Sequence, residues 1–191
     1  EFRRYTTFLS MFDFSYYDTL MAIGVTFPLI TAGVDLSIGT GMVCYALIGG
    51  TLVRSYNCPI VVAMLVCVAL GLIFGLLNGI LIGVMDLAPF LATLCTMMIT
   101  RGVGSLFSAT PWPTTGQPGG WFHSIFKLTF GSGRSATRIP IGLLLMVILV
   151  LVMEFVLNHT KFGRYTIAIG SNKEATRLSG INVKFYHVMV Y

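Results

Sequence analysis

The chain has 191 residues, of which 55% are hydrophobic and 10% are charged, and its mean hydropathy is +0.85. These values exclude an ordinary water-soluble domain and indicate a membrane protein. The net charge of +5 does not indicate nucleic-acid binding, because the few basic residues gather in loops, where they orient membrane spans.

Several apolar runs approach the roughly 20 residues that a helix needs to cross about 30 Å of hydrocarbon. The sequence therefore predicts an all-α, polytopic membrane protein with about five spans, and no strand-like alternation supports a barrel. The predicted spans are Tyr17–Ala32, a second run ending near Val53, Ile60–Val84, Phe90–Phe107 and Ile141–Leu157.

The stretch AGVDLSIGTG separates the first two spans. Gly33 is expected to end one helix in the left-handed conformation, and Asp35 is expected to cap the next. Asp35, with Ser37, is equally a candidate for a translocation path, since a carboxylate near hydrocarbon is costly and usually functional.

The third span carries Gly71, Gly75, Gly79 and Gly83 at i, i+4 spacing, which puts them on one helix face. Small residues there allow close backbone contact with another helix. Packing within the subunit is favoured over a dimer seam. The same span carries Asn78, and the fourth span carries Thr93 and Thr96. These polar residues either bond between helices or line a polar conduit.

Two ionisable side chains lie within predicted spans. Arg101 is toward the outer end of the fourth span and Glu154 is near the inner end of the fifth. Snorkelling or local pairing is favoured over a transport role for both.

Basic residues near span ends predict the orientation. Five of them between Lys161 and Lys184 face a single acid, Glu174, so this segment is expected to be cytoplasmic. The tryptophan-containing loop from Thr110 to Arg138 and the turn RSYNCP are then external, whereas MDLAP and AGVDLSIG are internal.

The polar stretch SNKEATRLSGINV, residues 171–183, predicts a short helix between membrane spans. Asn172 is expected to cap it, Glu174 and Arg177 lie one turn apart, and Gly180 ends it. Its apolar face consists of Ala175, Leu178 and Ile181.

Enzyme chemistry has little support. No phosphate-binding loop or HExxH is present, the three histidines are scattered, and the four cysteines form no CxxC pair. The loose matches DLSIG and SIFK lack the partner motifs that a nucleophile site requires.

Four ordered blocks, ITAGVDLSIGTG, GLLNGILIG, APFLATLCTMMITRGV and FGRYTIAIGSNKEATRLSGINV, resemble the permease subunits of sugar-type ABC importers for ribose, galactose, xylose and arabinose. The resemblance implies a bacterial inner-membrane permease that dimerises with a second, identical or different, permease subunit. It implies two further partners, a cytoplasmic ATPase that binds ATP and Mg²⁺ and a periplasmic sugar-binding protein. No cofactor is expected in this chain.

The resemblance makes residues 161–184 a cytoplasmic coupling loop within one incomplete permease domain, 1–191. Its ATPase-coupling residues would be Asn172, Glu174, Ala175, Arg177, Leu178, Gly180 and Ile181. The chain starts without Met and ends as an apolar run begins, so it is expected to be a fragment without the first and the C-terminal spans. Branched-chain amino acid or nucleoside permeases, a passive channel or secondary carrier, and a membrane acyltransferase are the alternatives.

Overall fold

The computed structural model describes residues 5–107, 112–113, 120–121, 127–130 and 137–191. The predicted helical class is confirmed, since helices form most of the described chain. They are α1 (Tyr5–Ile30), α2 (Ile38–Ser55), α3 (Ile60–Gly83), α4 (Pro89–Ser105), α6 (Ile141–His159), α7 (Lys161–Ser171), α8 (Lys173–Leu178) and α9 (Val183–Val190).

Among the described residues, α2, α3 and α6 are long and apolar enough to cross a membrane. In α1 the apolar part is the shorter stretch Tyr17–Ile30. The 17 residues of α4 rise about 25 Å, which is at the lower limit for a span. The predicted helix positions hold within a few residues, except that α1 begins well before Tyr17.

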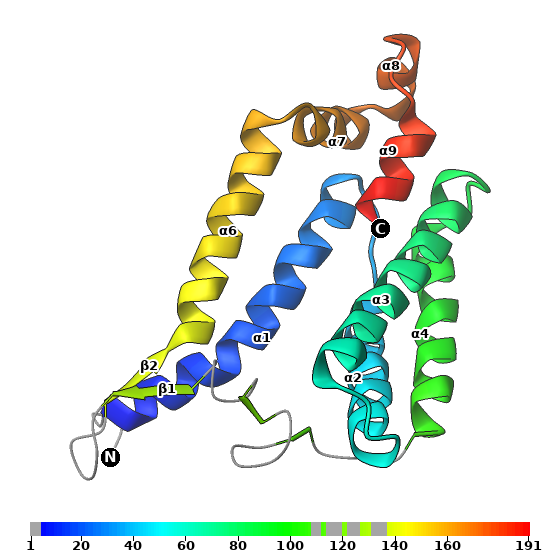
Figure 1. Cartoon of the computed structure of the whole chain (residues 1–191). Coiled ribbons are helices and arrows are strands. Elements are labelled where there is room, and N and C mark those ends of the chain that lie inside the picture. The colour runs from blue at the N-terminus through cyan, green and yellow to red at the C-terminus, as the bar shows by residue number, and fades with distance from the viewer. Residues whose placement is uncertain (1–4, 108–111, 114–119, 122–126, 131–136) are drawn as a thin grey trace.

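The helices form two packed groups joined at one end (Figure 1). On one side α1 packs against α6, and on the other α2 packs against both α3 and α4. Helix α7 crosses the end of α6, and α9 turns back to lie against α3. The turns after α1, α3 and α6 therefore share one end of the molecule, as the predicted topology requires.

The opposite end carries the chain between α4 and α6. Much of this predicted external loop lies outside the described residues. Its described part contains an antiparallel pair that the sequence did not predict, β1 (Lys127–Phe130) and β2 (Thr137–Pro140), with Leu128 opposite Ile139. Trp112 donates a hydrogen bond from Nε1 to the Ala46 carbonyl at 3.1 Å, which ties the loop to α2.

The junction between α1 and α2 differs from its prediction. Ala32, not Gly33, takes the left-handed conformation, with φ of 59°. At Gly33 a Cβ would meet the hydroxyl end of the Tyr191 side chain, so the glycine leaves room for that side chain. Asp35 is not the N-cap of α2 either. Ser37 occupies that position. The backbone N–H of Ser37 donates a hydrogen bond to the Asp35 carboxylate at 2.8 Å.

Helix α7 also emerges only in the structure. Its buried face carries Gly163, Thr166 and Ile169, whereas Lys161 and Arg164 are exposed. The Thr160 side chain caps it by accepting from the Gly163 N–H. This amphipathic pattern places a helix across the end of α6, where the sequence suggested a polar loop.

Candidate functional site

Four of the five polar residues predicted for a translocation path form one chain of hydrogen bonds, and the fifth, Thr93, bonds to the backbone next to Asp35. The Thr96 hydroxyl donates to Asn78 Oδ1, and Asn78 Nδ2 donates to Ser37 Oγ at 3.0 Å. The Ser37 hydroxyl in turn donates to Asp35 Oδ1 at 2.6 Å. Thr93 Oγ1 donates to the Val34 carbonyl at 3.1 Å. The structure therefore brings all five residues together.

This network holds a non-helical segment, residues 31–37, beside the C-terminal part of α3. Asn78 lies five residues before the last residue of α3, which is about 7.5 Å along the helix axis. Ser37 bonds to it and so lies at a similar depth. Non-helical backbone at membrane depth occurs only where protein buries it or where it lines a cavity.

Four of the five candidate path residues are buried and hydrogen-bonded within the protein. Asn78, Thr93 and Thr96 are at most 1% exposed, and Ser37 is 8% exposed. Their hydroxyls and amide bond between helices, which favours the first of the two predicted alternatives. Asp35 differs in being partly exposed. Together with Ser37 and Asn78 it lines a cavity of about 370 Å³ between α1, α2 and α3.

The glycine row of α3 faces α9. A Cβ on Gly79 would lie 2.7 Å from the Val188 carbonyl oxygen, and one on Gly75 would lie 2.6 Å from the Tyr191 carbonyl oxygen. One on Gly83 would lie 3.0 Å from the Lys184 carbonyl oxygen. These three glycines therefore let α9 approach α3 closely within one chain. Gly71 is looser, with Tyr45 Cε2 at 3.8 Å.

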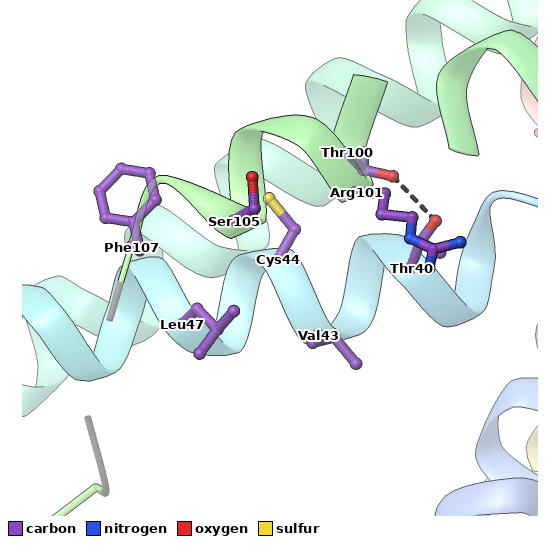
Figure 2. Close-up of a pocket in the computed structure, with 9 residues that line it drawn as sticks. Thr40, Val43, Cys44, Leu47, Thr100, Arg101, Ser105 and Phe107 are labelled. Carbon is purple, nitrogen blue, oxygen red and sulfur yellow. Dashed lines mark hydrogen bonds between the residues drawn. The ribbon is translucent and has the colours of Figure 1, made fainter. Parts of the chain in front are cut away.

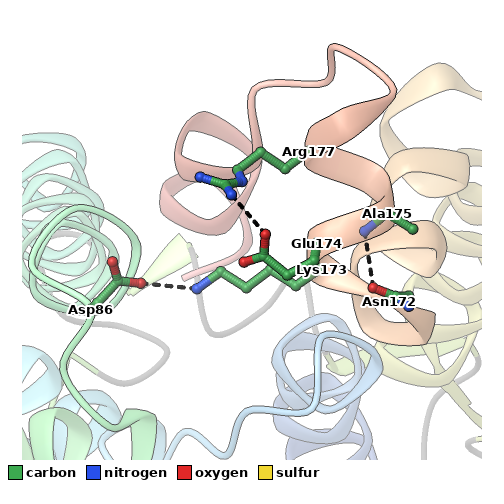
Figure 3. A network of polar contacts seen from close by, with 6 residues as sticks. All are labelled: Asp86, Asn172, Lys173, Glu174, Ala175 and Arg177. Atoms are coloured by element: carbon green, nitrogen blue, oxygen red, sulfur yellow. Dashed lines mark hydrogen bonds and ion pairs between the residues drawn. The ribbon is translucent and has the colours of Figure 1, made fainter.

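Helix α8 has the local geometry that the sequence predicts (Figure 3). Asn172 Oδ1 accepts from the Ala175 N–H at 2.9 Å, and Glu174 and Arg177 form an ion pair of 2.8 Å. Gly180 has φ of 82°, the left-handed conformation that ends a helix. The cap and the stop are thus confirmed, whereas a role in binding an ATPase stays a prediction.

An ion pair that the sequence did not reveal links α8 to the α3–α4 turn. Lys173 Nζ lies 2.9 Å from Asp86 Oδ1, and both side chains are largely exposed (Figure 3). The hydrogen bond from Lys173, and then its charge, lower the pKa of the Asp86 carboxyl. Protonation would therefore weaken the pair only below the ordinary carboxyl range, and the pair persists near neutral pH. No local signal predicts it, because 87 residues separate the partners.

The predicted contact face of α8 is open. Leu178 is 84% exposed, Ala175 is exposed and Ile181 is partly exposed. Thr176 instead points inward, and its hydroxyl donates to the Asn172 carbonyl at 2.8 Å. The helix is therefore fixed from within while its apolar side chains face outward.

The two ionisable residues of the spans differ. Glu154 accepts from Asn158 Nδ2 at 3.1 Å, so it is locally paired on the surface of α6. Figure 2 shows the Arg101 guanidinium on the Thr40 side, away from Ser105 and Phe107 and so away from the C-terminal end of α4. Snorkelling or local pairing of Arg101 stays a prediction. A charge that faces lipid at the middle of a spanning helix costs roughly 2.5–3.5 kcal/mol on insertion scales.

No cluster of three or more potential metal-ligating side chains occurs among the described residues. The four cysteines are free thiols. The chemistry available in this part of the chain is therefore hydrogen bonding, helix packing and the charges of α8.

Comparisons of the sequence with known proteins identify its family. The family model described as branched-chain amino acid transport system / permease component matches residues 7–191. The ribose import permease protein RbsC of Escherichia coli strain K12 is 33% identical, over 91% of this chain and 53% of that protein. The galactose/methyl galactoside import permease protein MglC of Salmonella typhimurium strain LT2 is 33% identical, over 97% and 60%.

The fructose import permease protein FruG of Bifidobacterium longum is 30% identical, over 95% of this chain and 54% of that protein. The chain thus spans little more than half the length of these curated relatives. No solved structure matches it significantly. On the family match and these identities, the chain belongs to the branched-chain amino acid transport system / permease component family.

Proposed function

We propose that the chain is part of the membrane-spanning permease subunit of an ATP-driven monosaccharide importer in a bacterial inner membrane. The observation that carries the proposal is α8, a capped helix with an open apolar face at the end shared by the turns after α1, α3 and α6. The names of relatives that import ribose, galactose and fructose favour a sugar over the amino acids in the family description.

The proposed partners divide the work. A cytoplasmic ATPase binds and hydrolyses ATP with Mg²⁺, so this chain is non-catalytic. A periplasmic sugar-binding protein delivers the substrate, and a second permease subunit, identical or different, completes the path within the lipid bilayer. ATPase closure would move α8, and alternating access would follow from helices rocking around a central site.

Two contacts would carry movement of α8 into the membrane. Helix α9 follows α8 and lies against the glycine row of α3, where backbone touches backbone at Gly79. The Lys173–Asp86 pair links α8 to the turn between α3 and α4. Helices α3 and α4 carry Asn78 and Thr96 of the network. A shift of these two helices would therefore move the segment that carries Asp35. Asp35, Ser37 and Asn78, which line the cavity between α1, α2 and α3, are the proposed path residues. Thr96 and Thr93 would position them through bonds to Asn78 and to the Val34 carbonyl.

Leu178→Asp in the full-length permease tests the coupling. A charge buried without a partner at an interface typically costs several kcal/mol. We expect the variant to reach the membrane and to dock the loaded binding protein, yet to lose the ATPase or its stimulation. Ser179→Asp is the matched control, because it adds the same charge at an exposed residue next to Leu178 that is not one of the predicted coupling residues. Unchanged ATPase co-purification with unchanged stimulated hydrolysis in Leu178→Asp would refute the coupling role.

A further inference from the structure

The outer half of the bundle contains a groove that the coupling account does not use. It lies between α2 and α4, and we call it the α2–α4 groove; its lining includes Thr40, Val43, Leu47, Arg101, Ser105 and Phe107 (Figure 2). Its volume is about 360 Å³, within the roughly 300–1,000 Å³ typical of small-molecule sites.

The position of Arg101 makes a lipid-facing role costly. Arg101 lies 12 residues after Pro89, the first residue of α4, and four before Ser105, the last, which is about 18 Å and 6 Å along the axis. Helical side chains lean toward the N-terminus, and Figure 2 shows the guanidinium displaced that way, toward Thr40. The charge therefore lies within the length of α4 and away from its C-terminal end. A charge at such a position in a spanning helix is more favourable against water, a ligand or protein than against lipid.

The surroundings of Arg101 suit a neutral, hydroxyl-rich ligand. Arg101 is the one charged residue among the described residues of the lining, and within the described part of the chain it has no hydrogen-bond or ion-pair partner. A guanidinium presents five N–H donors and no acceptor. An anionic ligand would be expected to meet further cations, whereas Val43, Leu47 and Phe107 offer apolar walls.

We propose that the α2–α4 groove is open to water and is a station of the sugar separate from the Asp35 cavity, and that Arg101 donates hydrogen bonds there to hydroxyl oxygens of the monosaccharide in transit. The proposal rests on the proposed import function. The hydrogen bond between Thr40 Oγ1 and Thr100 Oγ1, 2.8 Å long, fixes α2 against α4 beside the guanidinium. The apolar walls pack against the C–H faces of the sugar while the donors read its hydroxyls.

Water access to the groove is the first test. Val43→Cys and Leu72→Cys are introduced separately into the full-length permease, with its native cysteines replaced, assembled with its ATPase and binding protein. Both side chains are exposed in the structure, and both lie near the middle of the bundle, Leu72 on α3. A charged, membrane-impermeant thiol reagent, applied from either side, is expected to label Val43→Cys and not Leu72→Cys. If neither introduced cysteine is labelled by the reagent, the proposal is overturned.

The sugar contact is tested with the same protein. A saturating monosaccharide delivered by the docked binding protein is expected to slow labelling of Val43→Cys. Labelling at an unchanged rate would overturn the assignment of a sugar to the groove. If instead the wild-type assembly takes up no monosaccharide with ATP while Val43→Cys is still labelled, the proposed function fails and the water-facing groove stands.

Substitution of Arg101 separates ligand contact from a structural ion pair. Arg101→Gln is expected to lower uptake about tenfold or more, since it removes hydrogen bonds from a charged donor. Binding-protein-stimulated ATP hydrolysis and thermal stability should remain, and Arg101→Lys should recover part of the uptake. Loss of yield, stability and hydrolysis together, without rescue by Lys, would instead show that Arg101 pairs with a carboxylate, and would overturn the proposal.

Discussion

The contact between α3 and α9 gives the most quantitative test of the packing. A Cβ added at Gly79 would lie 2.7 Å from the Val188 carbonyl oxygen and 2.9 Å from Val188 Cα, whereas ordinary contact begins at 3.4 Å. Helix α9 would have to retreat by about 0.7 Å, the difference between 3.4 and 2.7 Å. The obstacle is backbone, so no side-chain rotation relieves it. Overpacking of this kind costs roughly 1–3 kcal/mol.

Gly102→Ala is the matched control. Gly102 lies inside α4 and has no atom within 4 Å of an added Cβ. Both substitutions gain the same helix propensity, roughly 0.5–1 kcal/mol, so the difference between them isolates the cost of the clash. In thermal unfolding of the full-length permease in detergent, Gly79→Ala should melt clearly below Gly102→Ala. Equal melting temperatures would refute close packing of α9 on the glycine row.

Three further predictions follow from the contacts around α8 and Asn78. Lys173→Glu should lower stimulated ATP hydrolysis, and adding Asp86→Lys should restore it. Stability should change little because the pair is exposed. If hydrolysis is not restored, the Lys173–Asp86 pair does not transmit movement of α8. Asn78→Leu should lower the free energy of unfolding by roughly 1–3 kcal/mol, measured by denaturation, because buried partners lose their hydrogen bonds; unaltered stability would count against the network. In intact cells an impermeant thiol reagent should label Tyr56→Cys and spare Lys173→Cys, and the reverse would invert the orientation.

Patterns local in the sequence predicted much of the fold. The apolar runs located α2, α3, α4 and α6 within a few residues, and Asn172 and Gly180 marked the limits of α8. These signals are short-range, since span length, capping and left-handed turns depend on neighbouring residues. The same logic failed at Gly33, which does not take the left-handed conformation and lies beside Tyr191, 158 positions away in sequence number.

The arrangement of the site depended on distant contacts. The sequence identified Asp35, Ser37, Asn78, Thr93 and Thr96 as unusual for their location. It did not show that four of them bond in a chain while Thr93 bonds to the Val34 carbonyl. It also placed the glycines on one face without naming α9 as the partner, and it gave no sign of the Lys173–Asp86 pair. The direction of the Arg101 guanidinium likewise depends on how α2 and α4 pack.

Uptake by proteoliposomes tests the central claim most directly. The full-length permease is reconstituted with its ATPase facing the lumen, ATP and Mg²⁺ inside, and the binding protein with radiolabelled ribose, galactose or fructose outside. Accumulation of one of these sugars above its external concentration is expected with ATP, and its loss is expected without the ATPase or with Leu178→Asp. Accumulation of none of them, or equal uptake in the absence of ATP, would contradict the assignment of this chain to an ATP-driven monosaccharide importer.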